Sequence, residues 1–266
     1  MVAEQSRVAY AGIDVAIAKD KRLPVVVVVR SAGRLEPLAL RGRGVPEPPR
    51  GCGNAAIIKG ENRERLASET ITFLKRIEGH CHVQIERIAI DAPSAPRRDD
   101  QRLREAEAAL DNEGISYIQT PNRAAFDSMP DRVGRHLEAG GSHSTLPCAN
   151  QLWMLFGFTL FDALSRAGWI CLEVYPQATI RILRSGQQHK STAGAVVAQM
   201  TAAACHTGWP AKPGKSALAS VAYGSMHDRF DAYLAAWVAS LPDNERRPLG
   251  NPPDDVIWVP RLETVV

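Results

Sequence analysis

The first forty residues contain three short runs of hydrophobic positions separated by polar turns. The runs cover residues 8–16 (VAYAGIDVA), 23–31 and 35–40, and they are rich in Val, Ile and Leu. Short β-rich runs bounded by turn residues are typical of strands that follow one another closely along the chain. The pattern therefore predicts an opening β-meander.

Helical and extended patterns alternate after the meander. Residues 62–79 place apolar side chains mostly at helical spacing, and residues 83–90 form an apolar strand. Asp91 follows this strand directly, and Ala92-Pro93 prevents the strand from continuing. The Asp91 carboxylate is therefore expected at the carboxyl end of a strand, where open α/β sheets place their chemistry.

The second half of the chain continues this alternation. Residues 150–167 predict a buried core helix, and residues 169–175 predict a strand that Pro176 stops. Between these elements we expect an irregular loop at 42–60, a polar helix at 99–112, a short strand at 115–119 and a loop-rich insertion or lid at 120–147. Towards the C-terminus we expect further elements at 177–183 and 192–206, a last helix at 227–241 and an extended segment at 256–259. The order of elements predicts one α/β domain over residues 1–266 with a mixed sheet.

Composition narrows the class of protein. A chain of 266 residues with 45% hydrophobic residues can build one large core, and its 23% charged residues argue against disorder. No apolar run approaches the roughly 18 residues of a membrane helix, so no membrane partner is expected. A net charge of +3 neither indicates nor excludes a nucleic-acid partner. Five scattered cysteines and an N-terminus without a secretory signal favour reduced thiols and a cytoplasmic location.

Acidic residues in apolar surroundings are the main chemical signal. Asp14, Asp91 and Glu173 lie in or at the ends of predicted strands, and Asp228 and Asp231 lie on the last predicted helix. An ionised carboxylate near a core is costly unless it is paired or binds a metal. Oxygen ligands of this kind suit Mg²⁺ or Mn²⁺. One or two such ions activate water and stabilise the leaving oxygen during phosphodiester hydrolysis.

The last helix is expected to bring its acids to the sheet. It carries small residues at four positions that allow close packing, namely Ala232, Ala235, Ala236 and Ala239. We therefore expect the carboxylates of Asp14, Asp91 and at least one of Asp228 or Asp231 to converge within a few ångströms.

Structural alternatives exist for these acids. Asp14 could form a buried ion pair with Lys19 or Lys190, and Asp91 could accept backbone N–H groups in a turn. Asp228 could cap the last helix, because Asp is favoured at helix N-termini.

Five short motifs carry a resemblance to a known family, namely GIDVA, IAIDAP, LEVYP, HDRFDAYLAA and IWVP. Through them the chain resembles the domain of unknown function 429 family, whose members are predicted nucleases of ribonuclease H-like fold. The resemblance runs over about residues 8–260. It implies a mixed five-stranded sheet flanked by helices, with an antiparallel three-strand opening followed by parallel strands. It also implies a metal-dependent nuclease with Asp14, Asp91 and the Asp228/Asp231 pair as ligands of Mg²⁺ or Mn²⁺. Glu173 would be a further acid beside the site or would merely support it.

Nucleic acid is then the expected partner, and Lys190 and Arg123 are candidate phosphate contacts. Two other functions stay open. Actin-like phosphotransferases share the strand meander and a first-strand Asp and bind Mg-ATP, but they need a duplicated domain for which one short chain lacks room. A non-catalytic binding protein could also keep the ribonuclease H-like fold.

Overall fold

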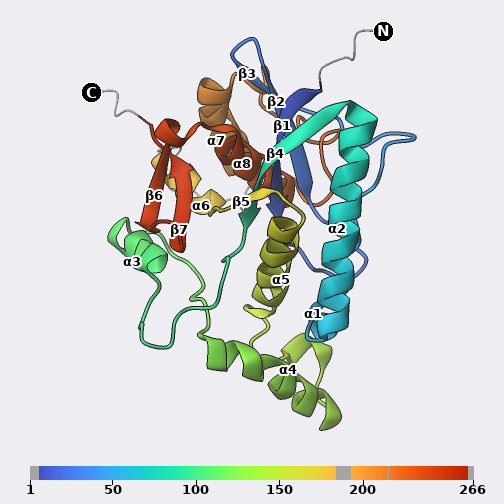
Figure 1. The fold of residues 1–266 in the computed structure, drawn as a ribbon, viewed down its shortest axis with the longest axis vertical. Coiled ribbons are helices and arrows are strands. Elements are labelled where there is room, and N and C mark those ends of the chain that lie inside the picture. The colour runs from blue at the N-terminus through green and yellow to red at the C-terminus, as the bar shows by residue number, and fades with distance from the viewer. Residues whose placement is uncertain (1–5, 184–192, 215, 263–266) are drawn as a thin grey trace.

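A five-stranded mixed sheet forms the centre of the protein (Figure 1). The computed structural model describes residues 6–183, 193–214 and 216–262. The strand order is β3-β2-β1-β4-β5, in which β1, β2 and β3 are antiparallel and β4 and β5 run parallel to β1. The strands are β1 (Arg7–Asp14), β2 (Val25–Ser31), β3 (Arg34–Pro37), β4 (Val83–Asp91) and β5 (Ile170–Glu173). This α/β arrangement is consistent with a ribonuclease H-like fold and confirms the predicted meander and mixed sheet.

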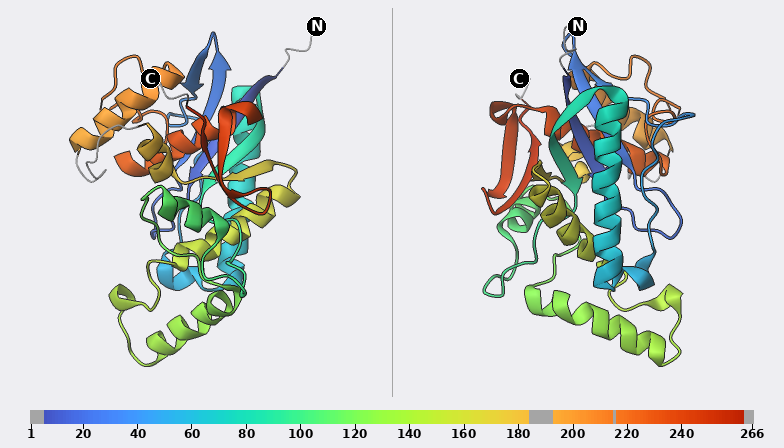
Figure 2. Two further views of the ribbon diagram at one scale, coloured as in Figure 1. Left: turned by 90° about the vertical axis from the view of Figure 1, so that its left-hand side faces the viewer. Right: turned by 45° about the vertical axis from the view of Figure 1, so that its right-hand side comes forward.

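Helices cover both faces of this sheet (Figure 2). One core contains side chains of α2 and α5, and the other contains side chains of α7 and α8. The helices are α1 (Asn54–Ile57), α2 (Gly60–Cys81), α3 (Glu105–Asn112), α4 (Arg123–Glu138), α5 (Leu152–Arg166), α6 (Pro176–Ile182), α7 (Ala193–Thr207) and α8 (Met226–Ser240). A small antiparallel hairpin of β6 (Arg246–Asn251) and β7 (Asp255–Pro260) packs against α3. Within the described residues, no helix has the length and apolar character needed to cross a membrane.

Five expectations about local structure were wrong. The segment 42–60, expected to be an irregular loop, contains the short helix α1. The polar helix begins at Glu105 rather than at residue 99, residues 115–119 form no strand, and β6 was not expected. The segment 120–147 is largely helical rather than loop-rich, because α4 fills residues 123–138. Asn122 caps α4 by accepting a hydrogen bond from the Ala125 amide (2.9 Å). In all three views, α4 lies at one end of the molecule beyond α1 and α5 (Figures 1 and 2).

Helix α8 lies unusually close to β1. A Cβ atom on Gly12 would overlap the backbone of α8 at Ala232 and Ala236. The predicted small residues thus permit the close approach, but glycine on the strand is equally necessary. This packing fixes the position of α8 over the strand ends.

A candidate carboxylate site at the strand ends

Asp14 and Asp91 are the last residues of β1 and β4 and lie directly opposite each other in the parallel register. Neighbouring strands are about 4.8 Å apart, so the two backbones are adjacent at this point. Both side chains are half-buried. Gly12, two residues before Asp14, lies against the backbone of α8. Ala89, two residues before Asp91, packs in one hydrophobic cluster with residues of α8. Because strand residues two apart share a face, both acids lie on the α8 face of the sheet.

Asp231 approaches the same strand ends from α8, and only 4% of it is exposed. It lies one turn before Ala235, which packs in one cluster with Ala89 of β4. The helix runs opposite to β4, because the guanidinium of Arg87, four residues before Asp91 in β4, donates to the Leu241 carbonyl after the end of α8 (2.9 Å). Four helical residues cover about 6 Å and two strand residues about 6.6 Å, so we infer that Asp231 lies near the level of Asp91.

Asp228 has a capping role at the N-terminus of α8. Its carboxylate accepts a hydrogen bond from the Ser225 amide (2.9 Å), and its own amide donates to the Ser225 hydroxyl (3.3 Å). This reciprocal pair is a capping box with Ser225 as the N-cap and Asp228 at the third helical position. The capping alternative for Asp228 is therefore confirmed, although Asp228 is not itself the N-cap.

The expected convergence of three carboxylates is not seen. Among the residues that the structure describes, no group of three or more His, Cys, Asp or Glu side chains is placed to hold a metal ion. What the fold brings together is the Asp14/Asp91 pair in register, with Asp231 buried close by.

Glu173 is engaged in a buried ion pair. Its two carboxylate oxygens accept hydrogen bonds from Nη1 and Nη2 of Arg104, each at 2.8 Å, and both residues are about 5% exposed. The Ser94 amide, just after β4, also donates to Glu173 (2.7 Å). Glu173 pairs in register with Ile90, whose side chain lies in the α2/α5 core, so it faces away from the α8 side. These contacts give Glu173 a supporting role.

Arg104 connects the strand ends to the small hairpin. Its Nε donates to Asp255 (2.9 Å), and Asp255 in turn accepts from the amides of Glu105 (2.6 Å) and Ala106 (3.4 Å) at the start of α3. Burial alone would lower the pKa of Arg104, but the charge and hydrogen bonds of Glu173 outweigh it and raise that pKa. The sequence analysis did not identify Arg104, because nothing local in its basic segment indicates a partner 69 residues away.

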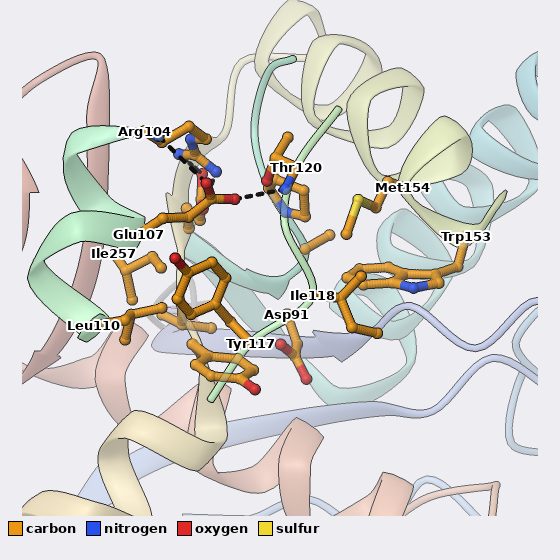
Figure 3. Close-up of a pocket in the computed structure, with 15 residues that line it drawn as sticks. Asp91, Arg104, Glu107, Leu110, Tyr117, Ile118, Thr120, Trp153, Met154 and Ile257 are labelled. Carbon is orange, nitrogen blue, oxygen red and sulfur yellow. Dashed lines mark hydrogen bonds and ion pairs between the residues drawn. The ribbon is translucent and has the colours of Figure 1, made fainter. Parts of the chain in front are cut away.

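A pocket opens next to Asp91 (Figure 3). Asp91, Glu173 and Arg104 line it together with a largely apolar wall that includes Tyr117, Ile118 and Trp153. Neither Trp153 nor Tyr117 was predicted from the sequence to be a site residue.

The structure describes one of the two candidate phosphate contacts, Arg123. Arg123 is the first residue of α4, is exposed, and lies 3.8 Å from Asp127 and over the ring of Phe126. These contacts are within α4 and do not connect it to the strand ends. Lys190 lies outside the described residues.

Comparison with known proteins identifies the family. No curated protein and no solved structure gives a significant match. A family model described as "Protein of unknown function (DUF429)" matches residues 12–255. Because this match covers most of the chain and includes both strand-end aspartates, the protein belongs to the DUF429 family.

Proposed function

We propose that this protein is a metal-dependent nuclease of the ribonuclease H-like superfamily that hydrolyses phosphodiester bonds at the Asp14/Asp91 pair. The observation that carries the proposal is the register of these two acids at adjacent strand ends, on the face of the sheet that α8 covers. The carboxyl ends of strands are where open α/β sheets place ligands and catalytic groups.

The donor set fits a hard divalent cation. Asp14 and Asp91 offer only carboxylate oxygens, which are the ligands that Mg²⁺ and Mn²⁺ prefer. Mg²⁺ is commonly held by one or two protein carboxylates, with water and substrate phosphate completing its shell, so a pair is sufficient. Asp14 and Asp91 would hold the ion, which when bound supplies activation of water and stabilisation of the leaving oxygen. Asp231 adds negative charge near the pair and so favours cation binding.

An arginine cluster next to the site supports a nucleic-acid substrate. The guanidinium groups of Arg22 and Arg41 lie 6.0 Å and 5.0 Å from the ring centre of Tyr223. Burial and then the positive charge of Arg50 lower the pKa of Arg22, and burial and then Arg41 lower the pKa of Arg229. Arg22 is paired with Glu47, but the four arginines outnumber the two nearby acids, Glu47 and Asp228, and this excess of positive charge would favour binding of a polyanion.

The arginine cluster is connected to the strand ends by direct contacts. Arg22 comes two residues before Pro24, whose carbonyl accepts a hydrogen bond from the Asp14 amide (3.2 Å). The Nε of Arg229 donates to the Gly224 carbonyl (2.8 Å), and Gly224 is packed against Pro24. A phosphodiester backbone that crosses the cluster would thus reach Asp14.

The test is cleavage of a panel of single-stranded, duplex and branched DNA and RNA with Mg²⁺ or Mn²⁺. We expect the wild type to cleave at least one substrate, and Asp14→Asn and Asp91→Asn to lose this activity. Asp162→Asn is the matched control, since Asp162 is an exposed residue of α5 that pairs only with Arg166 in the contacts described. A wild type that cleaves nothing, or aspartate variants that cleave normally, would contradict the proposal.

A further inference from the structure

The pocket beside Asp91 has the character of a binding site for a flat ligand. Its wall combines aromatic and aliphatic side chains from the segment before α4, from α5 and from β7, namely Tyr117, Ile118, Trp153, Met154 and Ile257. Ile118 is 44% exposed, and Trp153 and Tyr117 are half-buried. Large apolar side chains left open to solvent around one hollow are common in ligand pockets.

The polar groups of the aromatic rings are already engaged within the protein. The Trp153 indole N–H donates to the Asn150 carbonyl (2.8 Å), and the Tyr175 hydroxyl donates to the Ser116 carbonyl (2.8 Å). Burial, followed by a hydrogen bond with Asp111, raises the pKa of Tyr117 to about 12. The pocket therefore offers ring faces rather than hydrogen-bonding edges.

The charged side chains Arg104, Glu173 and Glu107 of the pocket wall are hydrogen-bonded within the protein. Arg104 is paired with Glu173, and Glu107 accepts hydrogen bonds from the amides of Thr120 (2.6 Å) and Arg104 (3.3 Å). This wall has no unpaired guanidinium that would select an anion. A ligand would accordingly place an uncharged, flat group in the pocket and its charged group beyond the rim, toward Asp91.

We propose that the pocket receives one nucleobase of the substrate strand, stacked on Trp153 next to the scissile phosphate. The inference rests on the proposed nuclease function, because it is that function which places a phosphodiester at Asp91. A nucleobase is flat and uncharged and is joined through its sugar to a phosphate, so it matches both the ring-lined pocket and the adjacent carboxylates. A base inside a duplex must leave its stack to enter such a pocket. The preferred substrate is therefore a single strand or an unpaired nucleotide in a branched structure.

The experiment measures binding separately from cleavage. Fluorescein-labelled 12-nucleotide DNA and RNA single strands are titrated by anisotropy with the cleavage-inactive Asp14→Asn protein and with the same protein carrying Trp153→Ala. Base–aromatic stacking predicts a loss of affinity of about 5- to 100-fold for Trp153→Ala. Trp153→Phe keeps a flat ring and should restore most of that affinity. Trp169→Ala is the matched control, since Trp169 is also half-buried against the α2/α5 core but does not line the pocket.

A scan of single abasic positions then identifies the base. One abasic position should weaken binding to the protein that keeps Trp153 by about the same factor as the Trp153→Ala substitution does. The same abasic position should not weaken binding to the Trp153→Ala protein further, because both changes remove the same contact. Independent losses, or an affinity that Trp153→Ala leaves unchanged, would overturn the base pocket; cleavage by the wild type, with Trp153 and Asp14 present, would then leave the nuclease proposal intact. A wild type that neither binds nor cleaves any strand would overturn both.

Discussion

Replacing Glu173 by Gln separates a structural acid from a metal ligand. The substitution keeps the size of the side chain but removes the charge that Arg104 needs, and both residues are about 5% exposed. Breaking a buried ion pair by removing one partner costs about 3–5 kcal/mol of unfolding free energy. Asp255 still contacts Arg104 at Nε (2.9 Å), so we expect the lower end of this range, about 3 kcal/mol. For a chain of this size the loss corresponds to a fall in Tm of roughly 6–12 °C.

The assay is thermal and urea unfolding of Glu173→Gln in the absence of divalent metal, followed by circular dichroism. A double variant, Glu173→Leu with Arg104→Met, replaces the pair by apolar groups and should lose less stability than the single variant. Asp255 then loses its cation, but it is more exposed than Glu173 and keeps the hydrogen bonds from the amides of Glu105 and Ala106. Below its Tm, Glu173→Gln should keep the metal dependence of the wild type. A fully stable Glu173→Gln that loses metal-dependent cleavage would refute the reasoning and make Glu173 a ligand.

Four other outcomes follow from the same structure. Asp14→Asn should fold normally, with an unchanged or slightly higher Tm without metal, because it removes like charge from the strand ends; a large fall in Tm would instead indicate a buried ion pair. Mg²⁺ or Mn²⁺ at a hundredfold excess over Kd should stabilise the wild type by about 2.7 kcal/mol, seen as a rise in Tm that Asp14→Asn lacks. Gly12→Ala should cost at least about 1–3 kcal/mol in urea unfolding, and should impair cleavage, because its Cβ overlaps the α8 backbone at Ala232. Burial raises the pKa of Cys171 to about 11, so at pH 8 peptide mapping should find it alkylated far more slowly than exposed Cys205, with the rate increasing at higher pH.

The sheet was predictable because its strands are marked locally. A run of five valines specifies β2, an apolar run followed by a polar turn indicates β1, and Asp91 followed by Ala92-Pro93 marks the end of β4. The meander and the strand-end position of Asp91 were therefore available from the sequence. Asp14 was expected inside a strand over residues 8–16, whereas it is the last residue of β1, and its register with Asp91 agrees with the resemblance that suggested a shared site.

The elements that were missed depend on contacts or carry conflicting signals. Helix α4 contains Pro130 and Gly134, which favour a turn, and its buried residues Met129 and Val133 make only a narrow apolar stripe. Strand β6 has little β-propensity of its own and is defined by its pairing with β7.

The supporting parts of the site could not be predicted from the sequence, because they depend on contacts between distant residues. The Arg104 to Glu173 pair joins residues far apart along the chain, and the pocket assembles Tyr117 and Trp153 from separate elements. Periodicity shows which face of an element is apolar, but it does not show which distant side chain will satisfy a buried charge.

Binding of Mn²⁺ followed by electron paramagnetic resonance tests the central claim most directly, since it requires no knowledge of the substrate. The account predicts that the wild type and the control Asp162→Asn bind Mn²⁺ equally, and that Asp14→Asn and Asp91→Asn each bind at least about tenfold more weakly, equivalent to about 1.4 kcal/mol. Equal Mn²⁺ affinity in the wild type and in both strand-end variants would contradict the assignment of Asp14 and Asp91 as the metal-binding pair.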